Sequence, residues 1–416
     1  MNQKKVLISQ PYGNTFVRGL LPSLENAGIL GKYYTLMATK PDAPWLKLMP
    51  NSVKSELLRR TFPIDADKIE TSVYQTVEIG RKLLNQFGLR GKDYELIQYI
   101  NQNFDKSISN KLETILTKEN IGSVYAYEDI ALKTFKKAKT LGLKCVYDLP
   151  IAYWEHARKF QQEEAERYPE WAITLKGGID DPEDKLKRKA EEIELADLTV
   201  VPSQFVKDSV PNWVPREKIL ISPFGTPENL PILKTNAAHN KKENKLRVLF
   251  VGSMSQRKGL GDLFAAIKIL NNPQVELVVL GSLLAPMKFY RDQCPDFVYE
   301  PGRPHAEVLE LMRTCDVFCL PSIIEGRALV MQEAMSQGLP LIITPNTGGD
   351  DLIEEEKTGF LVPIRSPEII ADKINWFLEN SERLPQMSNL AQQKAIEYTW
   401  ASYGSKIVSA IKELTP

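Results

Sequence analysis

The chain has 416 residues, of which 43% are hydrophobic and 25% charged, and its formal net charge is zero. That length exceeds one ordinary hydrophobic core, so two domains of roughly 200 residues are expected. A neutral chain without a basic stripe argues against nucleic-acid binding. The four cysteines lack disulfide-framework spacing and no apolar run approaches ~20 residues, so we expect a cytoplasmic protein that does not span a membrane.

Short apolar runs alternate with amphipathic segments through the first half of the chain. Strands are predicted at 4–9, 32–38, 123–129, 144–150, 198–203 and 218–223, with helices between them. This alternation is typical of a parallel sheet covered by helices on both faces. We place a first domain at 1–225 and a polar, Asn- and Lys-rich linker at 226–245.

A second alternating unit follows the linker. Its strands are predicted at 246–253, 275–282, 297–302, 316–321 and 340–345, with an edge strand at 359–363. We expect a second domain at 246–390, and helices at 391–416 that pack back toward the first domain. The fold class is α/β, with two doubly wound Rossmann-like domains facing a central cleft and a helical tail. Ligands of such sheets bind beyond the carboxyl ends of the strands.

Residues 321–338 combine a turn, a carboxylate and a helix that carries a second carboxylate. Glu325 precedes the helix and Glu333 lies about two turns later. Leu329, Val330, Ala334 and Met335 have helical spacing and predict a buried stripe. The start of a helix can hold an anion, and carboxylates accept hydrogen bonds from sugar or ribose hydroxyls. Glu pairs at this spacing also occur in ordinary charged segments, so the spacing alone decides nothing.

Two cations stand where the first strand of the second domain leads into a helix. Arg257 and Lys258 precede a helix predicted to begin near Gly259. Cations are unfavourable at this end of a helix, which is already positive, unless an anion binds there. The pair is interpreted as a diphosphate clamp or as two solvated surface charges. The loop at 300–308, which contains Arg303, and the Gly-Gly turn at 344–353 end neighbouring strands. Asp350 or Asp351 could instead cap a helix.

Three motifs in a fixed order carry a family resemblance. They are VGSMSQRKG (251–259), PSIIEGRALVMQEAMSQGLPLI (321–342) and TGGDDLIEEEKTGFLVP (347–363). Together they resemble the nucleotide-sugar-binding domain of the group 1, family 4 retaining glycosyltransferases, which have the GT-B fold. Residues 189–226 match the family more loosely. The resemblance implies a hexosyltransferase that moves a sugar from a nucleotide-diphosphate sugar to an acceptor hydroxyl in glycan, glycolipid or exopolysaccharide biosynthesis.

The resemblance also implies roles for single residues. Lys258 would bind the donor diphosphate, Glu325 would face the sugar, and Glu333 would bind the ribose hydroxyls. Ser253 stands where the family often has arginine, so Arg257 would supply the second cation. Arg257, Lys258 and Glu325 are the catalytic candidates. The full donor set is Gly252, Ser253, Arg257, Lys258, Arg303, Glu325, Gly326, Arg327, Ala328, Leu329, Val330 and Glu333. The family needs no metal and no cofactor beyond the donor, and no nucleophile is assigned.

The acceptor side is less well defined. Gly13 and Asn14 follow the first strand, and Asp148 ends another, where Tyr147 replaces the histidine common in relatives. His156 is interpreted as an acid or base in the cleft, or as an ordinary surface histidine. The acceptor would be a saccharide, a lipid-linked molecule or a small molecule. The basic segment at 47–62 is either a peripheral contact with anionic membrane or an amphipathic helix packed on the first domain.

Two other classes share the same architecture. One is a non-catalytic binding module that kept the fold. The other is a phosphorylase or sugar-nucleotide epimerase. Donor hydrolysis and substrate-dependent nucleotide release would separate these alternatives from a transferase.

Overall fold

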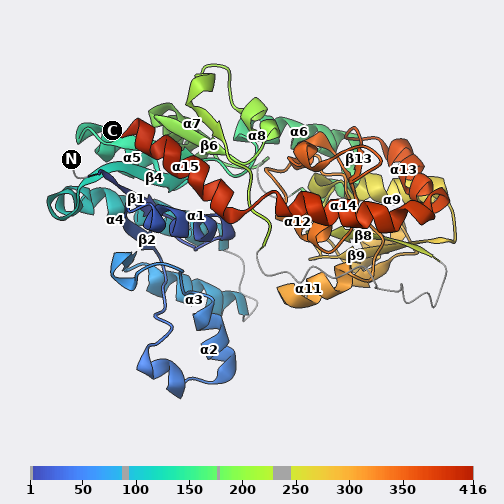
Figure 1. Ribbon diagram of the computed structural model, residues 1–416, viewed down its shortest axis with the longest axis horizontal. Coiled ribbons are helices and arrows are strands. Elements are labelled where there is room, and N and C mark those ends of the chain that lie inside the picture. Colours follow the sequence, from blue (N-terminus) through green and yellow to red (C-terminus); the bar gives the residue numbers. More distant parts are fainter. Residues whose placement is uncertain (1–2, 87–92, 176–178, 228–244, 416) are drawn as a thin grey trace.

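The computed structural model describes residues 3–86, 93–175, 179–227 and 245–415, which form two α/β units (Figure 1). The first unit is built on a parallel sheet with strand order β3-β2-β1-β4-β5-β6-β7. Its strands are β1 (Lys5–Ser9), β2 (Leu30–Thr35), β3 (Ile69–Thr71), β4 (Ile121–Tyr127), β5 (Lys144–Asp148), β6 (Leu198–Val201) and β7 (Ile219–Ile221). Its helices are α1 (Thr15–Asn26), α2 (Asn51–Leu58), α3 (Gln75–Gln86), α4 (Asp93–Lys118), α5 (Leu132–Thr140), α6 (Trp154–Arg167), α7 (Glu183–Leu195) and α8 (Gln204–Ser209).

The second unit repeats this plan. Its strands are β8 (Leu246–Val251), β9 (Val275–Leu280), β10 (Val298–Glu300), β11 (Val317–Leu320), β12 (Leu341–Ile343) and β13 (Gly359–Leu361), in the parallel order β10-β9-β8-β11-β12-β13. Its helices are α9 (Leu260–Leu270), α10 (Met287–Gln293), α11 (His305–Met312), α12 (Leu329–Ser336), α13 (Pro367–Glu379) and α14 (Leu384–Ile396). The predicted fold class is confirmed, and the edge strand lies where it was predicted.

Short 3₁₀ turns connect several of these elements. They are η1 (Pro44–Leu48), η2 (Ala66–Lys68), η3 (Pro169–Thr174), η4 (Arg216–Lys218), η5 (Gln256–Lys258), η6 (Pro345–Thr347), η7 (Asp350–Leu352) and η8 (Ser381–Arg383). The turn η5 matters most for function, because it contains the two cations singled out in the sequence.

Each sheet is buried on both faces. Every residue of β4 is buried, as expected for a central strand of a parallel sheet. One hydrophobic core surrounds the second sheet, and two others cover the faces of the first. The four cysteines are free and buried, as expected for core thiols. Within the described ranges, no helix has the length and apolar character needed to cross a bilayer.

The final helix returns to the first unit. In Figure 1, α14 lies on the second unit, whereas α15 (Trp400–Leu414) runs back along α1. Tyr403 and Ile407 of α15 share a hydrophobic core with Val17 and Leu21 of α1. An added Cβ at Gly19 would lie 2.1 Å from the Trp400 ring, so a glycine in α1 permits this close approach. The two units are therefore tied together at the carboxyl end of the chain.

Both sheets have a topological switch point. Strand order reverses between β1 and β4 in the first sheet and between β8 and β11 in the second. Ligands of doubly wound folds bind in the crevice beyond the strands at this point. The loops after β8 and β11 contain Arg257, Lys258 and Glu325, so topology alone brings the separate sequence motifs to one edge.

Candidate functional site

The loop after β8 is fixed by a glycine. Gly259 adopts the left-handed conformation at φ +73°, and an added Cβ there would lie 1.9 Å from the carbonyl oxygen of Pro321. Any other residue would be strained and would clash with the backbone at the end of β11. The backbone N–H of Ile323 also donates to the Arg257 carbonyl at 2.9 Å. The turn η5 is therefore packed directly against the loop that carries Glu325.

Arg257 and Lys258 both pair with a carboxylate of the same chain, that of Glu325. Arg257 Nη1 donates to Glu325 Oε1 at 2.6 Å, and Lys258 Nζ pairs with the same oxygen. The side chain of Arg257 is 28% exposed, and those of Lys258 and Glu325 are each 12% exposed. Sequence reasoning expected an incoming anion to satisfy the cations. The structure instead supplies a carboxylate of the chain itself, which also balances the positive start of α9.

Burial and pairing shift the pKa values of this triad. Burial lowers the pKa of Lys258 below that of free lysine, and the Glu325 carboxylate offsets only part of this effect. Burial acts to raise the pKa of Glu325, but Lys258 and Arg257 outweigh it, so the pKa of this carboxyl lies below its ordinary value. Glu325 therefore stays ionised, while Lys258 is unusually sensitive to the charge of whatever lies beside it.

The loop after Glu325 touches the first unit. An added Cβ at Gly326 would lie 1.8 Å from the carbonyl oxygen of Pro150, in the loop after β5. Ser203 Oγ, at the end of β6, donates to the Gly326 carbonyl at 2.6 Å. The candidate donor loop is thus held from the strand ends of the opposite sheet.

Arg327 is engaged by groups of the chain itself. Its side chain is buried, where Nε donates to Gln332 at 2.9 Å and Nη1 contacts Asp351 at 2.6 Å. These partners hold the Arg327 side chain within the protein, and its place in the donor site stays a prediction. Asp351 is engaged by the same ion pair, and η7 begins after Gly349 without a side-chain cap, so the alternative of a helix cap by Asp350 or Asp351 is wrong.

The first turn of α12 presents backbone donors near this loop. Ala328 N–H donates to the Thr347 carbonyl at 3.3 Å, and the helix begins at Leu329. The N–H groups of Leu329 and Val330 lie in its first turn, where amides have no partner within the helix. The buried stripe is confirmed at Ala334 and Met335, whereas Leu329 and Val330 are only half-buried. Met331 and Gln332 are buried in addition. Leu329 packs toward the first unit, which explains the difference.

Glu333 lies one turn into α12 and has a partner that the sequence analysis missed. His305 Nε2, at the start of α11, lies 3.0 Å from Glu333 Oε1. Burial raises the pKa of Glu333, and His305 offsets part of the shift. His305 could have been noticed, since it follows the loop at 300–308 already singled out.

The other predicted donor residues are spread around the same edge. Gly252 has φ +157°, and an added Cβ would only touch the Lys258 side chain, at 3.6 Å. Ser253 Oγ lies 3.5 Å from Ser255 Oγ. Arg303 pairs with Glu300 of β10. Arg303 is thus engaged by its own strand and does not join the Glu325 triad through any contact described here.

Among the predicted acceptor residues, Gly13 and Asn14 shape the start of α1. Gly13 has φ +61°, and the Asn14 side chain accepts from Val17 N–H at 2.9 Å as a helix cap. Asp148 is not at the surface, because its side chain is 1% exposed and accepts a hydrogen bond from the Tyr125 hydroxyl. Burial raises the pKa of Asp148 to about 7.

His156 is half-buried against two aromatic rings. Its ring centroid lies 4.7 Å from Phe160 and 5.8 Å from Phe205. Burial and then Lys159 lower its pKa, which favours the neutral imidazole. The half-buried ring is compatible with packing against Phe160 and Phe205.

The segment at 47–62 contains α2, and several of its side chains fall outside the described residues. Phe62 is described and packs edge-on against Tyr33, with ring centroids 4.9 Å apart. The Arg18 guanidinium lies 4.4 Å from the Phe62 ring centroid. At least this aromatic residue belongs to the first unit, as the alternative of an internally packed segment predicted.

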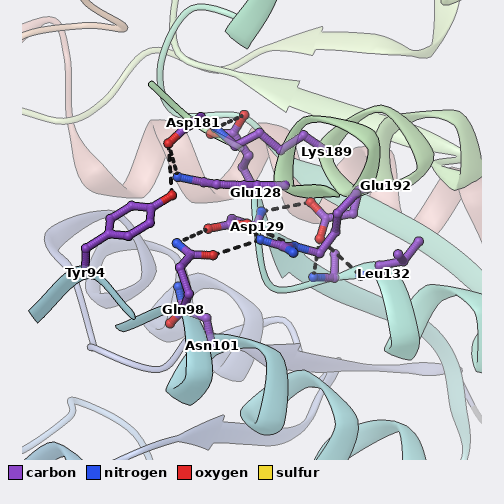
Figure 2. Close-up of polar contacts among 12 residues, drawn as sticks. Tyr94, Gln98, Asn101, Glu128, Asp129, Leu132, Asp181, Lys189 and Glu192 are labelled. Atoms are coloured by element: carbon purple, nitrogen blue, oxygen red, sulfur yellow. Dashed lines mark hydrogen bonds and ion pairs between the residues drawn. The ribbon is translucent and has the colours of Figure 1, made fainter. Parts of the chain in front are cut away.

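A polar network that the sequence did not reveal lies at the switch point of the first sheet, shown in Figure 2. Arg188 of α7 donates to Asp129 at 3.0 Å and to Gln98 at 2.9 Å. The buried Glu192 carboxylate accepts from the Asp129 and Ala131 N–H groups at 2.8 and 2.9 Å, which closes the start of α5. Glu128 and Asp129 directly follow β4 and could have indicated such a network. They were instead included in the predicted strand at 123–129.

Comparison with protein families adds an independent observation. The description "Glycosyl transferases group 1" matches residues 231–394. The amylovoran biosynthesis glycosyltransferase AmsK of Erwinia amylovora is 29% identical over 171 residues, 38% of this chain and 41% of AmsK. The capsular polysaccharide biosynthesis glycosyltransferase CapM of Staphylococcus aureus is 26% identical over 208 residues, 46% of this chain and 54% of CapM. The chain thus spans about half the length of the curated relatives it matches.

Solved structures match over the whole chain. Sucrose-phosphate synthase from Thermosynechococcus elongatus is 17% identical, with a TM-score of 0.66, over 99% of both chains. Anabaena Alr3699/HepE in complex with UDP is 15% identical, with a TM-score of 0.64, over 98% of this chain and 100% of HepE. These likenesses establish the two-domain GT-B arrangement. Over residues 231–394, the chain is similar to the glycosyl transferases group 1 family.

Proposed function

We propose that this protein is a glycosyltransferase that moves a hexose from a nucleotide-diphosphate sugar to an acceptor hydroxyl, with retention of anomeric configuration. The observation that carries the proposal is the triad of Arg257, Lys258 and Glu325 at the switch point of the second sheet. A chain with this triad holds two cations and the start of α12 at the edge where a doubly wound sheet binds its ligand.

The charges match those of a departing diphosphate. As the sugar–phosphate bond breaks, negative charge grows on the phosphate oxygens and positive character grows on the anomeric carbon. Arg257, Lys258 and the first turn of α12 are suited to stabilise the negative charge, since preorganised donors cost no reorganisation during reaction. The sugar is attacked on the face that the leaving group vacates, and we assign no protein nucleophile.

Glu325 has two tasks in this proposal. Without donor, it neutralises Arg257 and Lys258, which limits the cost of burying them. When the diphosphate arrives, its oxygens compete for the same cations, and the Glu325 carboxylate becomes available to the sugar hydroxyls. Glu333, eight residues later and beside His305, is assigned to the ribose hydroxyls.

We further propose that transfer is independent of metal, because Arg257 and Lys258 supply positive charge next to the leaving group. EDTA would then leave turnover unchanged, whereas dependence on added Mg²⁺ or Mn²⁺ would contradict this part of the proposal. The acceptor is assigned to the strand ends of the first unit, around Gly13 and Asn14. AmsK and CapM are named for polysaccharide biosynthesis, which supports a saccharide or lipid-linked acceptor. HepE is described with UDP, which makes UDP-sugars the first donors to test.

The test begins with a thermal-shift screen of nucleotide sugars, because a ligand that binds only the folded state raises the melting temperature. With the donor found, Lys258→Ala and Glu333→Ala are expected to lower turnover at least tenfold while the fold is retained. The matched control is Lys268→Ala, an exposed lysine on α9 that is expected to behave like the wild type. Near-normal turnover of Lys258→Ala would refute the assignment. Binding of donor without hydrolysis or transfer would instead indicate a non-catalytic module.

A further inference from the structure

A segment of the first half of the chain is packed into the second unit. Helix α6 and the turn η3 lie between β5 and β6 in sequence, but Trp171 of η3 is 2% exposed within the core of the second sheet. Its ring centroid lies 5.0 Å from that of Phe289 and 5.9 Å from that of Phe264. Burying a tryptophan in this way anchors the segment to the second unit.

Buried charges complete the attachment. Glu164 of α6 is fully buried and accepts from Arg365 Nε at 2.5 Å, across the junction of the two units. Arg167 Nη2 donates to the buried Asp262 of α9 at 2.6 Å, and its Nη1 lies 3.3 Å from Glu164. The two carboxylates and the two guanidinium groups balance in charge, which is the condition for tolerating such groups inside a protein.

Gln256 lies at the centre of this network. Its Nε2 group donates to Glu164 Oε2 at 2.7 Å and to Asp262 Oδ2 at 2.9 Å. Its Oε1 atom accepts from Gly261 N–H at 3.0 Å, and its backbone N–H donates to Thr174 Oγ1 at 3.1 Å. Gln256 is fully buried, so both side-chain polar atoms are satisfied by protein groups alone.

The next two residues of η5 are Arg257 and Lys258. The Gln256 carbonyl accepts from Gly259 N–H at 2.8 Å, and Lys258 N–H donates to the Ser255 carbonyl at 3.1 Å. Because these bonds hold the turn together, a displacement of Gln256 also displaces Arg257 and Lys258. We infer that Gln256 and Glu164 are positioning residues for the diphosphate-binding pair, and that the α6–η3 segment thereby lets the first half of the chain set the geometry of the donor site. This inference rests on the proposed function and assigns neither residue a contact with substrate.

The network explains why an amide is required at position 256. An amide donates to Glu164 and Asp262 and also accepts from Gly261 N–H, whereas lysine and arginine have donors but no acceptor. A carboxylate would add a third negative charge and lose both donors, and an apolar residue would leave two carboxylate oxygens without this partner. Displacement by about 1 Å is enough to impair a positioned charge.

The test compares Gln256→Leu and Glu164→Gln with wild type, by calorimetric titration with UDP and with uridine. GDP with guanosine and ADP with adenosine are run in parallel. Both variants are expected to bind the diphosphate at least tenfold more weakly and the nucleoside within twofold of wild type. Glu163→Gln is the matched control, because it makes the same change one residue away, in a pair with Arg365 that does not touch Gln256. It is expected to leave both affinities unchanged.

The nucleoside measurement separates positioning from general loss of structure. Equal weakening of UDP and uridine in both variants would overturn the inference, and so would unchanged UDP binding. If Gln256→Leu does not fold, Glu164→Gln decides alone, since it keeps the shape of the side chain. If wild-type protein binds none of the diphosphates, the proposed function fails first and the inference falls with it.

Discussion

The buried Asp148 gives a stability prediction that can be worked out in sign and size. Its carboxyl pKa is about 7 in the folded chain, against an ordinary value of 3.8 in the unfolded chain. Between these values the folded state holds a proton that the unfolded state has lost, so stability falls as pH rises through this window. The difference of about 3 pKa units corresponds to a loss of roughly 4 kcal/mol in the free energy of unfolding. This loss is complete above pH 7 and absent below about pH 4.

Asp148→Asn removes this titration and keeps an oxygen that can accept from Tyr125. We expect the variant to be more stable than wild type at pH 8 by at least about 2 kcal/mol, half of the full value because the new amide N–H groups also need partners. At pH 4.5 the wild-type penalty is only about 1 kcal/mol, so the variant should have lost this advantage and be no more stable than wild type. The assay is urea unfolding of both proteins at several pH values, with Asp42→Asn, an exposed site, as the matched control. A variant less stable than wild type at pH 8 would refute the reasoning.

Two further predictions concern the donor loop and its charges. Gly326→Ala brings a Cβ within 1.8 Å of the Pro150 carbonyl, so it should weaken both donor binding and the contact between the units, whereas Gly302→Ala, whose added Cβ meets no described atom within 4 Å, should have neither effect. Thermal unfolding and UDP titration check both, and equal behaviour of the two variants would contradict the packing described. Because the pKa of Lys258 is lowered, UDP affinity should begin to fall at a pH below the ordinary lysine value of 10.5, by up to about tenfold per pH unit. Lys258→Arg is the control, because arginine stays charged and only the ionisation of UDP itself remains. If wild type and this variant lose UDP affinity with the same pH profile, Lys258 is not the group that titrates.

Sequence patterns predicted the architecture well because its signals are local. Apolar runs bounded by Gly and Pro marked the strands, and their alternation with helices implied two parallel sheets. The short edge strand β3 was missed, since Ile69–Thr71 has only three residues, none of them buried, and lies in a charged segment. Boundaries elsewhere shifted by a few residues, as for the strand at 123–129, which ends at Tyr127.

Contacts between distant segments could not be derived in this way. The ordered motifs identified Arg257, Lys258 and Glu325 as residues of one site, but not that Glu325 would pair with both cations. Nor did spacing indicate that Arg327 turns inward toward Asp351. Each of these outcomes depends on which side chains the fold brings together from loops many residues apart.

The α6–η3 segment shows the same limit most clearly. The sequence predicted helices between the strands of the first domain here, with His156 as a possible cleft residue, and gave no sign of a contact with the second domain. Trp171 is buried in the other unit because Gly261 leaves room for its ring: an added Cβ at that glycine would lie 3.0 Å from the indole. Only the assembled structure reveals that complementarity.

The central claim is that a departing diphosphate is held by Arg257, Lys258 and the first turn of α12. A crystal structure of the protein soaked with UDP, or with whichever nucleoside diphosphate binds in titration, tests it most directly. The account predicts phosphate oxygens within hydrogen-bonding distance of the Lys258 ammonium and the Arg257 guanidinium, with the ribose beside Glu333. A nucleotide bound at any other place on the chain would contradict it.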